Sequence, residues 1–224
     1  SLPKKTGCSE NLKESNCMEN IIWIRGELVP ESRAVVSVLS PTAQFGLNVF
    51  EGVRCYWNNN SNTLNIFRIE EHLSRLMESC KLARLPVPYS EKVIIDGLIN
   101  TLRINKFRED VAVRITIFAD GLGTWSSVSN TNMFIAPIRK SRTDLSNIPA
   151  MRASVSSWVR INDNSMPPRI KLGANYINGR YAHLQARSDG YDLLGVNRLD
   201  RLNSVSGIDG PLKRIRGDDF NDLR

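Results

Sequence analysis

The alternation of apolar and polar positions divides the chain into short extended runs and a few longer helical segments. Runs of about four to eight β-branched, aromatic or alternating apolar residues between turn residues are typical of strands. Short polar turns separate the first of these runs, so we expect an antiparallel sheet at the start of the chain. The pattern predicts strands at residues 21–24, 28–29, 34–38, 49–56, 64–67, 111–118, 132–136, 153–158 and 191–196.

Three further segments, residues 70–82, 90–105 and 177–187, carry apolar residues at the spacing of a helix. Pro86 and Pro88 separate the first two of these segments, because proline interrupts a helix. The mixture of antiparallel strands and helices predicts the α+β class.

A polar segment at residues 139–150 is predicted to link two lobes. The residues before it, 19–138, are expected to form a complete small α+β lobe, and residues 151–197 part of a second lobe. Residues 1–18 are polar and are expected to form a disordered leader. Residues 198–224 show little apolar periodicity, so we expect an atypical and poorly ordered tail.

The 224 residues carry a formal charge of +7, with 41% hydrophobic and 24% charged residues. This composition is ordinary for a globular protein large enough to bury a core. An anion- or nucleic-acid-binding module is an alternative that rests on the charge alone. Basic residues are dispersed among acidic ones and are not interleaved with aromatic ones, so no nucleic-acid partner is predicted.

The four cysteines, Cys8, Cys17, Cys55 and Cys80, show no CxxC spacing, and the chain has two histidines. Free thiols in a reducing cytoplasm are therefore a better interpretation than a zinc site, and no metal is predicted. No apolar run has the length of a membrane helix, so no membrane partner is expected. We expect a cytoplasmic location, with an organelle as the alternative.

The stretch PPRIKLGANY at residues 167–176 is the most informative one chemically. A nucleophilic lysine must be neutral, and burial or a nearby cation such as Arg169 lowers a lysine pKa. Tyr176 follows Lys171 by five residues and could direct its hydroxyl to the same ligand. On spacing alone, however, a surface lysine before a helix is the simpler interpretation of Lys171.

Arg114 stands within a run of β-branched residues. A charge in such a strand is costly unless it is paired, so Arg114 is a candidate binding residue. The alternative is an ordinary arginine on an edge strand.

Three motifs together resemble the class IV aminotransferases, in their branched-chain amino-acid form. They are PPRIKLGANY at 167–176, NVFEGVRCY at 48–56 and the pattern FRxxEHxxRL at 67–76. The resemblance extends from about residue 21 to residue 191. It implies a two-lobed fold type IV enzyme that depends on pyridoxal 5'-phosphate (PLP) and pairs as a homodimer.

The resemblance also implies roles for individual residues. Lys171 matches the lysine that forms the Schiff base with PLP and shuttles the substrate proton. Tyr176 matches the tyrosine on the phenolic oxygen of PLP, and Arg75 matches the arginine on its phosphate. Phe50 matches a wall of the substrate pocket, and Arg114 an arginine near the substrate carboxylate. The implied reaction moves an amino group from leucine, isoleucine or valine to 2-oxoglutarate.

Several positions depart from the family pattern. Ala112 stands where many branched-chain members have a tyrosine, and residues 121–127 occupy the place of a flexible active-site loop. Gly207 stands where the family has the glutamate that keeps the pyridine nitrogen of PLP protonated. We therefore expect an incomplete cofactor lobe. The alternatives are a non-catalytic truncated remnant, a D-amino-acid transaminase or an aminodeoxychorismate lyase.

Overall fold

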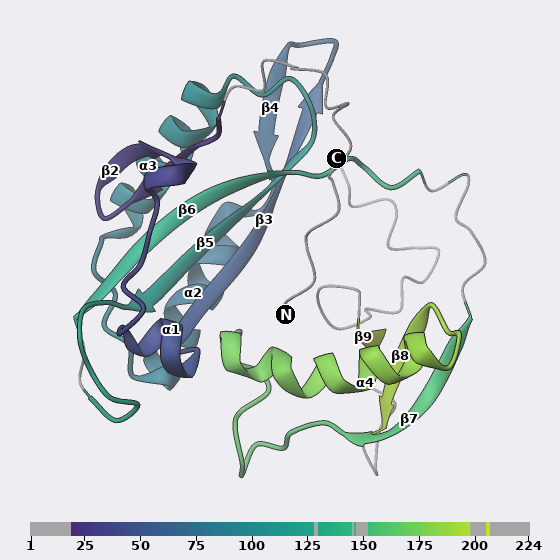
Figure 1. The fold of residues 1–224 in the computed structure, drawn as a ribbon. Coiled ribbons are helices and arrows are strands. Elements are labelled where there is room, and N and C mark those ends of the chain that lie inside the picture. The colour runs from purple at the N-terminus through teal and green to yellow at the C-terminus, as the bar shows by residue number, and fades with distance from the viewer. Residues whose placement is uncertain (1–18, 128–129, 145, 147–151, 198–204, 207–224) are drawn as a thin grey trace, which may run out of the picture.

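A computed structural model gives the fold of the chain (Figure 1). The leader expected at 1–18 lies outside the described residues, as do Gly207 and most of the tail expected at 198–224. Val205 and Ser206 of that tail are described and form a short strand. The structure describes residues 19–127, 130–144, 146, 152–197 and 205–206.

A six-stranded antiparallel sheet in the order β2-β1-β6-β5-β3-β4 forms the larger part of the structure (Figure 1). The long strands β3, β5 and β6 lie at its centre, and they pair over most of their length. This sheet confirms the α+β class and the antiparallel start. Its strands are β1 (Ile21–Ile24), β2 (Glu27–Pro30), β3 (Asn48–Asn58), β4 (Thr63–Ile66), β5 (Val111–Ala119) and β6 (Thr131–Arg139).

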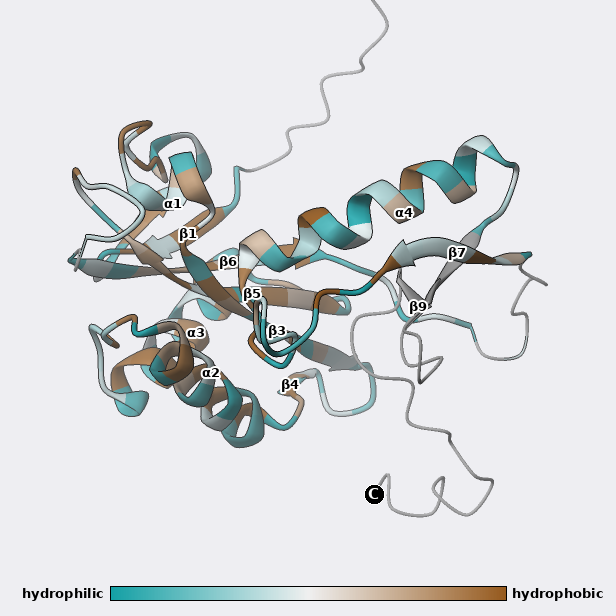
Figure 2. Cartoon of the chain, turned by 90° about the horizontal axis from the view of Figure 1, so that it is seen from below, coloured by the Kyte–Doolittle hydropathy of each residue, from teal (hydrophilic) through white to brown (hydrophobic). Residues whose placement is uncertain are grey.

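Helices α2 (Ile69–Ala83) and α3 (Glu91–Asn105) cover one face of this sheet (Figure 2). Ser90 begins α3 by accepting a hydrogen bond from the amide of Val93. Because side chains alternate across a strand, every second residue of β3, β5 and β6 enters the core beneath the helices. The fully buried apolar residues of this core include Val49, Val53, Leu73, Leu76, Ile94, Leu98, Val113, Ile115, Ile117, Met133 and Ile135.

The second sheet is small and has the order β7-β8-β9. Strands β7 (Ala153–Val159) and β8 (Leu193–Asn197) are parallel, and β9 (Val205–Ser206) is antiparallel to β8. A parallel pair needs a crossover, which helix α4 (Tyr176–Ser188) supplies. Trp158 stacks on Tyr181 at 5.4 Å between ring centroids and so packs α4 against β7.

The strand predicted at 34–38 is wrong. The 3-10 helix η1 (Glu31–Arg33) is followed there by irregular chain, in which Val35 and Val38 are 63% and 80% exposed. Helix α1 (Pro41–Phe45) was not predicted from the sequence. The Ser40 hydroxyl caps this helix on the amide of Ala43 at 3.3 Å, and Gly46 ends it at a φ of 68°.

Arg114 does not lie at an edge, because β5 runs between β3 and β6. Its register partners are the small residues Gly52 on β3 and Ala136 on β6, which leave room for a long side chain. The edge-strand interpretation of Arg114 is therefore wrong. None of the helices in the described ranges is long and apolar enough to cross a membrane.

Candidate active site

The candidate site forms where β3 has an unpaired edge. Strand β4 pairs with β3 from Cys55 to Asn58 and does not reach Phe50. The chain that precedes α4 occupies this edge, with a bridge between Val49 and Leu172. The amide of Phe50 donates to the Lys171 carbonyl at 3.0 Å. These backbone contacts hold Lys171 beside the sheet.

The path of this segment depends on a close approach and on a buried amide. Asn175 is buried, and its Nδ2 donates to the carbonyls of Pro167 and Ile170 at 3.3 and 3.0 Å. The 3-10 helix η2 (Gly173–Asn175) then brings Gly173 against Asn48. A Cβ at position 173 would lie 2.5 Å from Asn48 Oδ1, so a larger residue there would force the Asn48 side chain to move.

Gly173→Ala is expected to lower the free energy of unfolding by about 1–3 kcal/mol, the usual cost of overpacking. The Asn48 amide would have to move away from the Thr42 hydroxyl, to which it now donates at 3.1 Å. Urea unfolding measures the loss. The control is Gly52→Ala, because a Cβ at Gly52 meets nothing within 4 Å. Equal losses in the two variants would contradict the packing argument.

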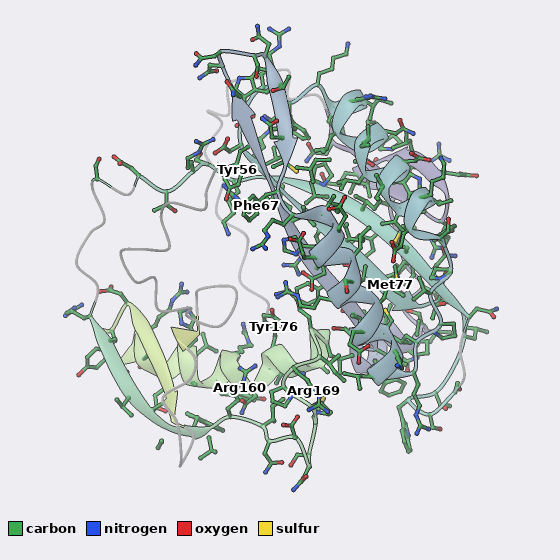
Figure 3. All side chains as sticks on the ribbon, turned by 180° about the vertical axis from the view of Figure 1, so that it is seen from behind. Tyr56, Phe67, Met77, Arg160, Arg169 and Tyr176 are labelled. Atoms are coloured by element: carbon green, nitrogen blue, oxygen red, sulfur yellow. The ribbon has the colours of Figure 1, made fainter. Side chains whose placement is uncertain are left out.

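Lys171 lies beside two aromatic rings. Its Nζ is 3.3 Å from the Tyr176 hydroxyl and 5.2 Å from the centroid of the Phe50 ring. Tyr176 lies at the start of α4, between this helix and the larger sheet (Figure 3). The Arg114 guanidinium stacks over the Phe50 ring, 4.2 Å from its centroid. The structure thus brings Lys171, Tyr176, Phe50 and Arg114 together.

A cavity of about 440 Å³ lies against the larger sheet. Its lining residues on β3 and β5 alternate with residues of the core beneath the helices, so it lies on the face away from α2 and α3. Phe50, Arg114 and Tyr176 line it, together with Thr116 and Phe118. The sequence reasoning missed the last two. The signal was present, because Thr116 and Phe118 follow Arg114 at two-residue steps and therefore share its face of β5.

Arg75 lies on α2, on the face of the larger sheet that the helices cover. Its Nε and Nη2 donate to the Glu51 carboxylate at 2.6 and 2.7 Å, and His72 Nδ1 lies 3.0 Å from the same carboxylate. Burial would raise the pKa of Glu51, but the bonds to His72 and Arg75 outweigh it and hold that pKa below its usual value. The charge of Lys171 adds to this lowering of the Glu51 pKa. Arg75 is thus bonded to the residue that follows Phe50, whose amide bonds to the Lys171 carbonyl, although Arg75 does not line the cavity.

Arg169, a possible cationic neighbour of Lys171, forms an ion pair with an acidic residue of its own. Its Nη1 pairs with Asp163 at 3.2 Å, and the side chain is exposed. Among the other candidates for chemistry, Cys55 and Cys80 are free and buried. Burial raises the pKa of each thiol to about 12, so both are neutral at physiological pH. In the part of the chain that the structure describes, no three His, Cys, Asp or Glu side chains gather as a metal site would require.

Comparison with known proteins gives a consistent family. Residues 48–199 match the model of the amino-transferase class IV family. A probable branched-chain-amino-acid aminotransferase of Aquifex aeolicus is 32% identical over 171 residues, which are 76% of this chain and 55% of the relative. The branched-chain-amino-acid aminotransferase of Escherichia coli K12 is 31% identical over 175 residues, 76% of this chain and 56% of the relative. The chain thus spans about half the length of these relatives.

Solved structures agree with the sequence comparison. The branched-chain aminotransferase of Thermoproteus uzoniensis with norvaline has a TM-score of 0.72 at 34% identity, over 79% of this chain and 59% of that one. The branched-chain amino acid aminotransferase of Thermobaculum terrenum in its PLP form has a TM-score of 0.71 at 35% identity, over 79% and 58%. The family match covers both the strand with Phe50 and the segment with Lys171. This chain therefore belongs to the class IV aminotransferase family.

Proposed function

We propose that this chain carries the cofactor-binding and substrate-binding residues of a PLP-dependent branched-chain aminotransferase. In this proposal, Lys171 is the lysine that holds PLP. The observation that carries the proposal is the position of the Lys171 amine, 3.3 Å from the Tyr176 hydroxyl, beside a cavity lined by Phe50 and Arg114. The names of the relatives support this reaction class, and the similar structure from Thermobaculum terrenum supports the cofactor, because it is a PLP form.

The residues present fit PLP by the chemistry of their side chains. The Lys171 amine suits the aldehyde of PLP, and the Tyr176 hydroxyl suits its phenolic oxygen as a hydrogen-bond partner. Arg75 offers a cation for a phosphate, and its Nη1 is not used by Glu51. When bound, the cofactor supplies a ring that withdraws electrons and so stabilises charge at the substrate α-carbon.

The side chains of this chain then have separate tasks. Lys171 Nζ takes the proton from the α-carbon of the amino acid and later returns it. Tyr176 keeps this nitrogen in place through the contact between its hydroxyl and Nζ. Arg114 binds the substrate carboxylate, because a guanidinium matches a carboxylate with two parallel bonds. The Phe50 ring gives an apolar wall that suits a branched aliphatic side chain.

The proposal is tested by trapping the cofactor on the protein. PLP is added to the full chain, the complex is reduced with borohydride, and the label is located by mass spectrometry. A single label on Lys171 is expected, and Lys171→Ala should lack it. Lys92→Ala is the control, because Lys92 is an exposed lysine on α3 that pairs with Asp96. Labels scattered over surface lysines, or no label, would overturn the proposal.

Two wider predictions belong to this proposal. One is the division into lobes at residues 139–150, and the other is assembly as a homodimer.

A transamination assay with a panel of amino acids, D-amino acids included, distinguishes the branched-chain reaction from that of a D-amino-acid transaminase.

A further inference from the structure

Glu51 is a carboxylate at a position where the sheet otherwise places apolar side chains. It lies between Val49 and Val53 in the two-residue alternation of β3, and all three are fully buried. Burying a carboxylate costs several kcal/mol unless it is paired and hydrogen-bonded. An apolar residue would fill this position equally well, so packing does not explain the carboxylate. Its role must be sought in the residues to which it bonds.

Both partners of Glu51 come from one face of α2. His72 and Arg75 are three residues apart, so their side chains are neighbours on the helix. Arg75 donates hydrogen bonds from Nε and Nη2 to the two carboxylate oxygens of Glu51, and His72 Nδ1 is hydrogen-bonded to Oε2. The Arg75 side chain remains 49% exposed, although its partner is completely buried. One edge of the guanidinium is therefore tied to the sheet, and the rest faces outward.

We infer that Glu51, assisted by His72, is a positioning residue that orients the Arg75 guanidinium for the phosphate of the cofactor. This inference rests on the proposed function, which assigns the phosphate to Arg75. A bidentate bond fixes the plane of a guanidinium as well as its distance. Glu51 does not use the remaining nitrogen, Nη1, which then has a defined direction.

Orientation and charge make opposite predictions for this pair. The Glu51 carboxylate neutralises part of the positive charge of Arg75, so its charge alone weakens the attraction for a phosphate. Its hydrogen bonds, by contrast, hold the guanidinium ready and reduce the entropy lost on binding. Glu51→Gln removes the charge and one half of the bidentate bond at nearly constant size. If Glu51 positions Arg75, this variant binds phosphate less tightly, whereas a purely electrostatic role requires tighter binding.

The test compares two ligands that differ only in the phosphate. Pyridoxamine 5'-phosphate and pyridoxamine are titrated into the full chain by calorimetry, since neither carries an aldehyde that would react with surface lysines. Glu51→Gln is expected to raise the Kd of the phosphorylated ligand about tenfold, on the scale of a hydrogen bond to a charged group. The Kd of pyridoxamine should stay within about twofold, because this ligand does not use Arg75. The control Glu71→Gln removes an equal charge from α2, where Glu71 pairs with Arg68, and should change neither value.

A double-mutant cycle shows whether Glu51 acts through Arg75. In an Arg75→Ala background, Glu51→Gln should have no further effect on the affinity for the phosphorylated ligand. His72→Gln provides a second variant, because His72 contacts the carboxylate from outside the core. It is expected to raise the Kd of pyridoxamine 5'-phosphate about threefold, as loss of one weaker hydrogen bond would. This variant decides the question if Glu51→Gln does not fold.

Three results with the Glu51→Gln variant overturn the inference. They are tighter phosphate binding by Glu51→Gln, an equal loss of affinity for both ligands, and a loss that persists without Arg75. If Arg75→Ala leaves the preference for the phosphorylated ligand unchanged while borohydride still labels Lys171, the inference fails together with the assignment of the phosphate to Arg75, and the proposal that Lys171 holds PLP stands. If the unchanged chain shows neither that preference nor the label, both fail.

Discussion

Replacing Lys171 with alanine is expected to slow the exchange of the α-proton of leucine by at least about a thousandfold in the PLP-loaded chain, within the range that a positioned acid-base group supplies. The structure motivates this because Lys171 Nζ is the amine held beside Tyr176 and the Phe50 ring. Proton NMR of α-deuterated leucine measures the exchange directly. It needs no second substrate, so it isolates the proton transfer from the rest of the reaction.

The same variant should keep its affinity for pyridoxamine 5'-phosphate within about threefold, because Arg75 and Tyr176 are unchanged and the lysine is not needed to bind a ligand without an aldehyde. Lys92→Ala serves again as the control and should retain full exchange. Exchange that survives in Lys171→Ala would show that another base removes the proton. A large loss of ligand affinity would instead indicate that Lys171 acts mainly in binding.

The elements with a strong period were predictable from the sequence, and those that depend on local capping were not. Strand β5 and helices α2 and α3 lie close to their expected positions, because each has a continuous apolar face. Helix α1 has five residues, too few to show a helical period, and Ser40 and Gly46 define it through caps. The β-branched residues at 34–38 favoured a strand, but none of the strands in the described ranges pairs with them.

The sequence indicated candidate site residues but not the contacts between them. Motifs identified Lys171 and Tyr176, whereas the pair of Glu51 and Arg75 joins residues 24 positions apart and depends on how α2 packs on β3. A signal for Glu51 was nevertheless present. It is a charged residue in a strand whose alternate positions are apolar, and the same argument singled out Arg114. Applied evenly along β3, it would have marked Glu51 as well.

Substitutions at two neighbouring positions of β5 are expected to have different effects, one on stability and the other on substrate binding. Ile115 is fully buried among the core residues beneath α2 and α3, so Ile115→Ala should lower the free energy of unfolding by about 2–5 kcal/mol. Natural domains are stable by only about 5–15 kcal/mol, so this loss is a large fraction of the whole. Urea unfolding of the full chain measures it.

Arg114→Ala should change the unfolding free energy by no more than about 1 kcal/mol, because the side chain is exposed and its main contact is the stacking on Phe50. On the proposed function, its effect should appear in catalysis instead, as a rise of at least about tenfold in the KM for the carboxylate-bearing substrate. The two positions are adjacent in sequence and point to opposite faces of the sheet. If Arg114→Ala were the more destabilising change, the Arg114 side chain would contribute more to the fold than its exposure indicates, and a role mainly in substrate binding would be contradicted.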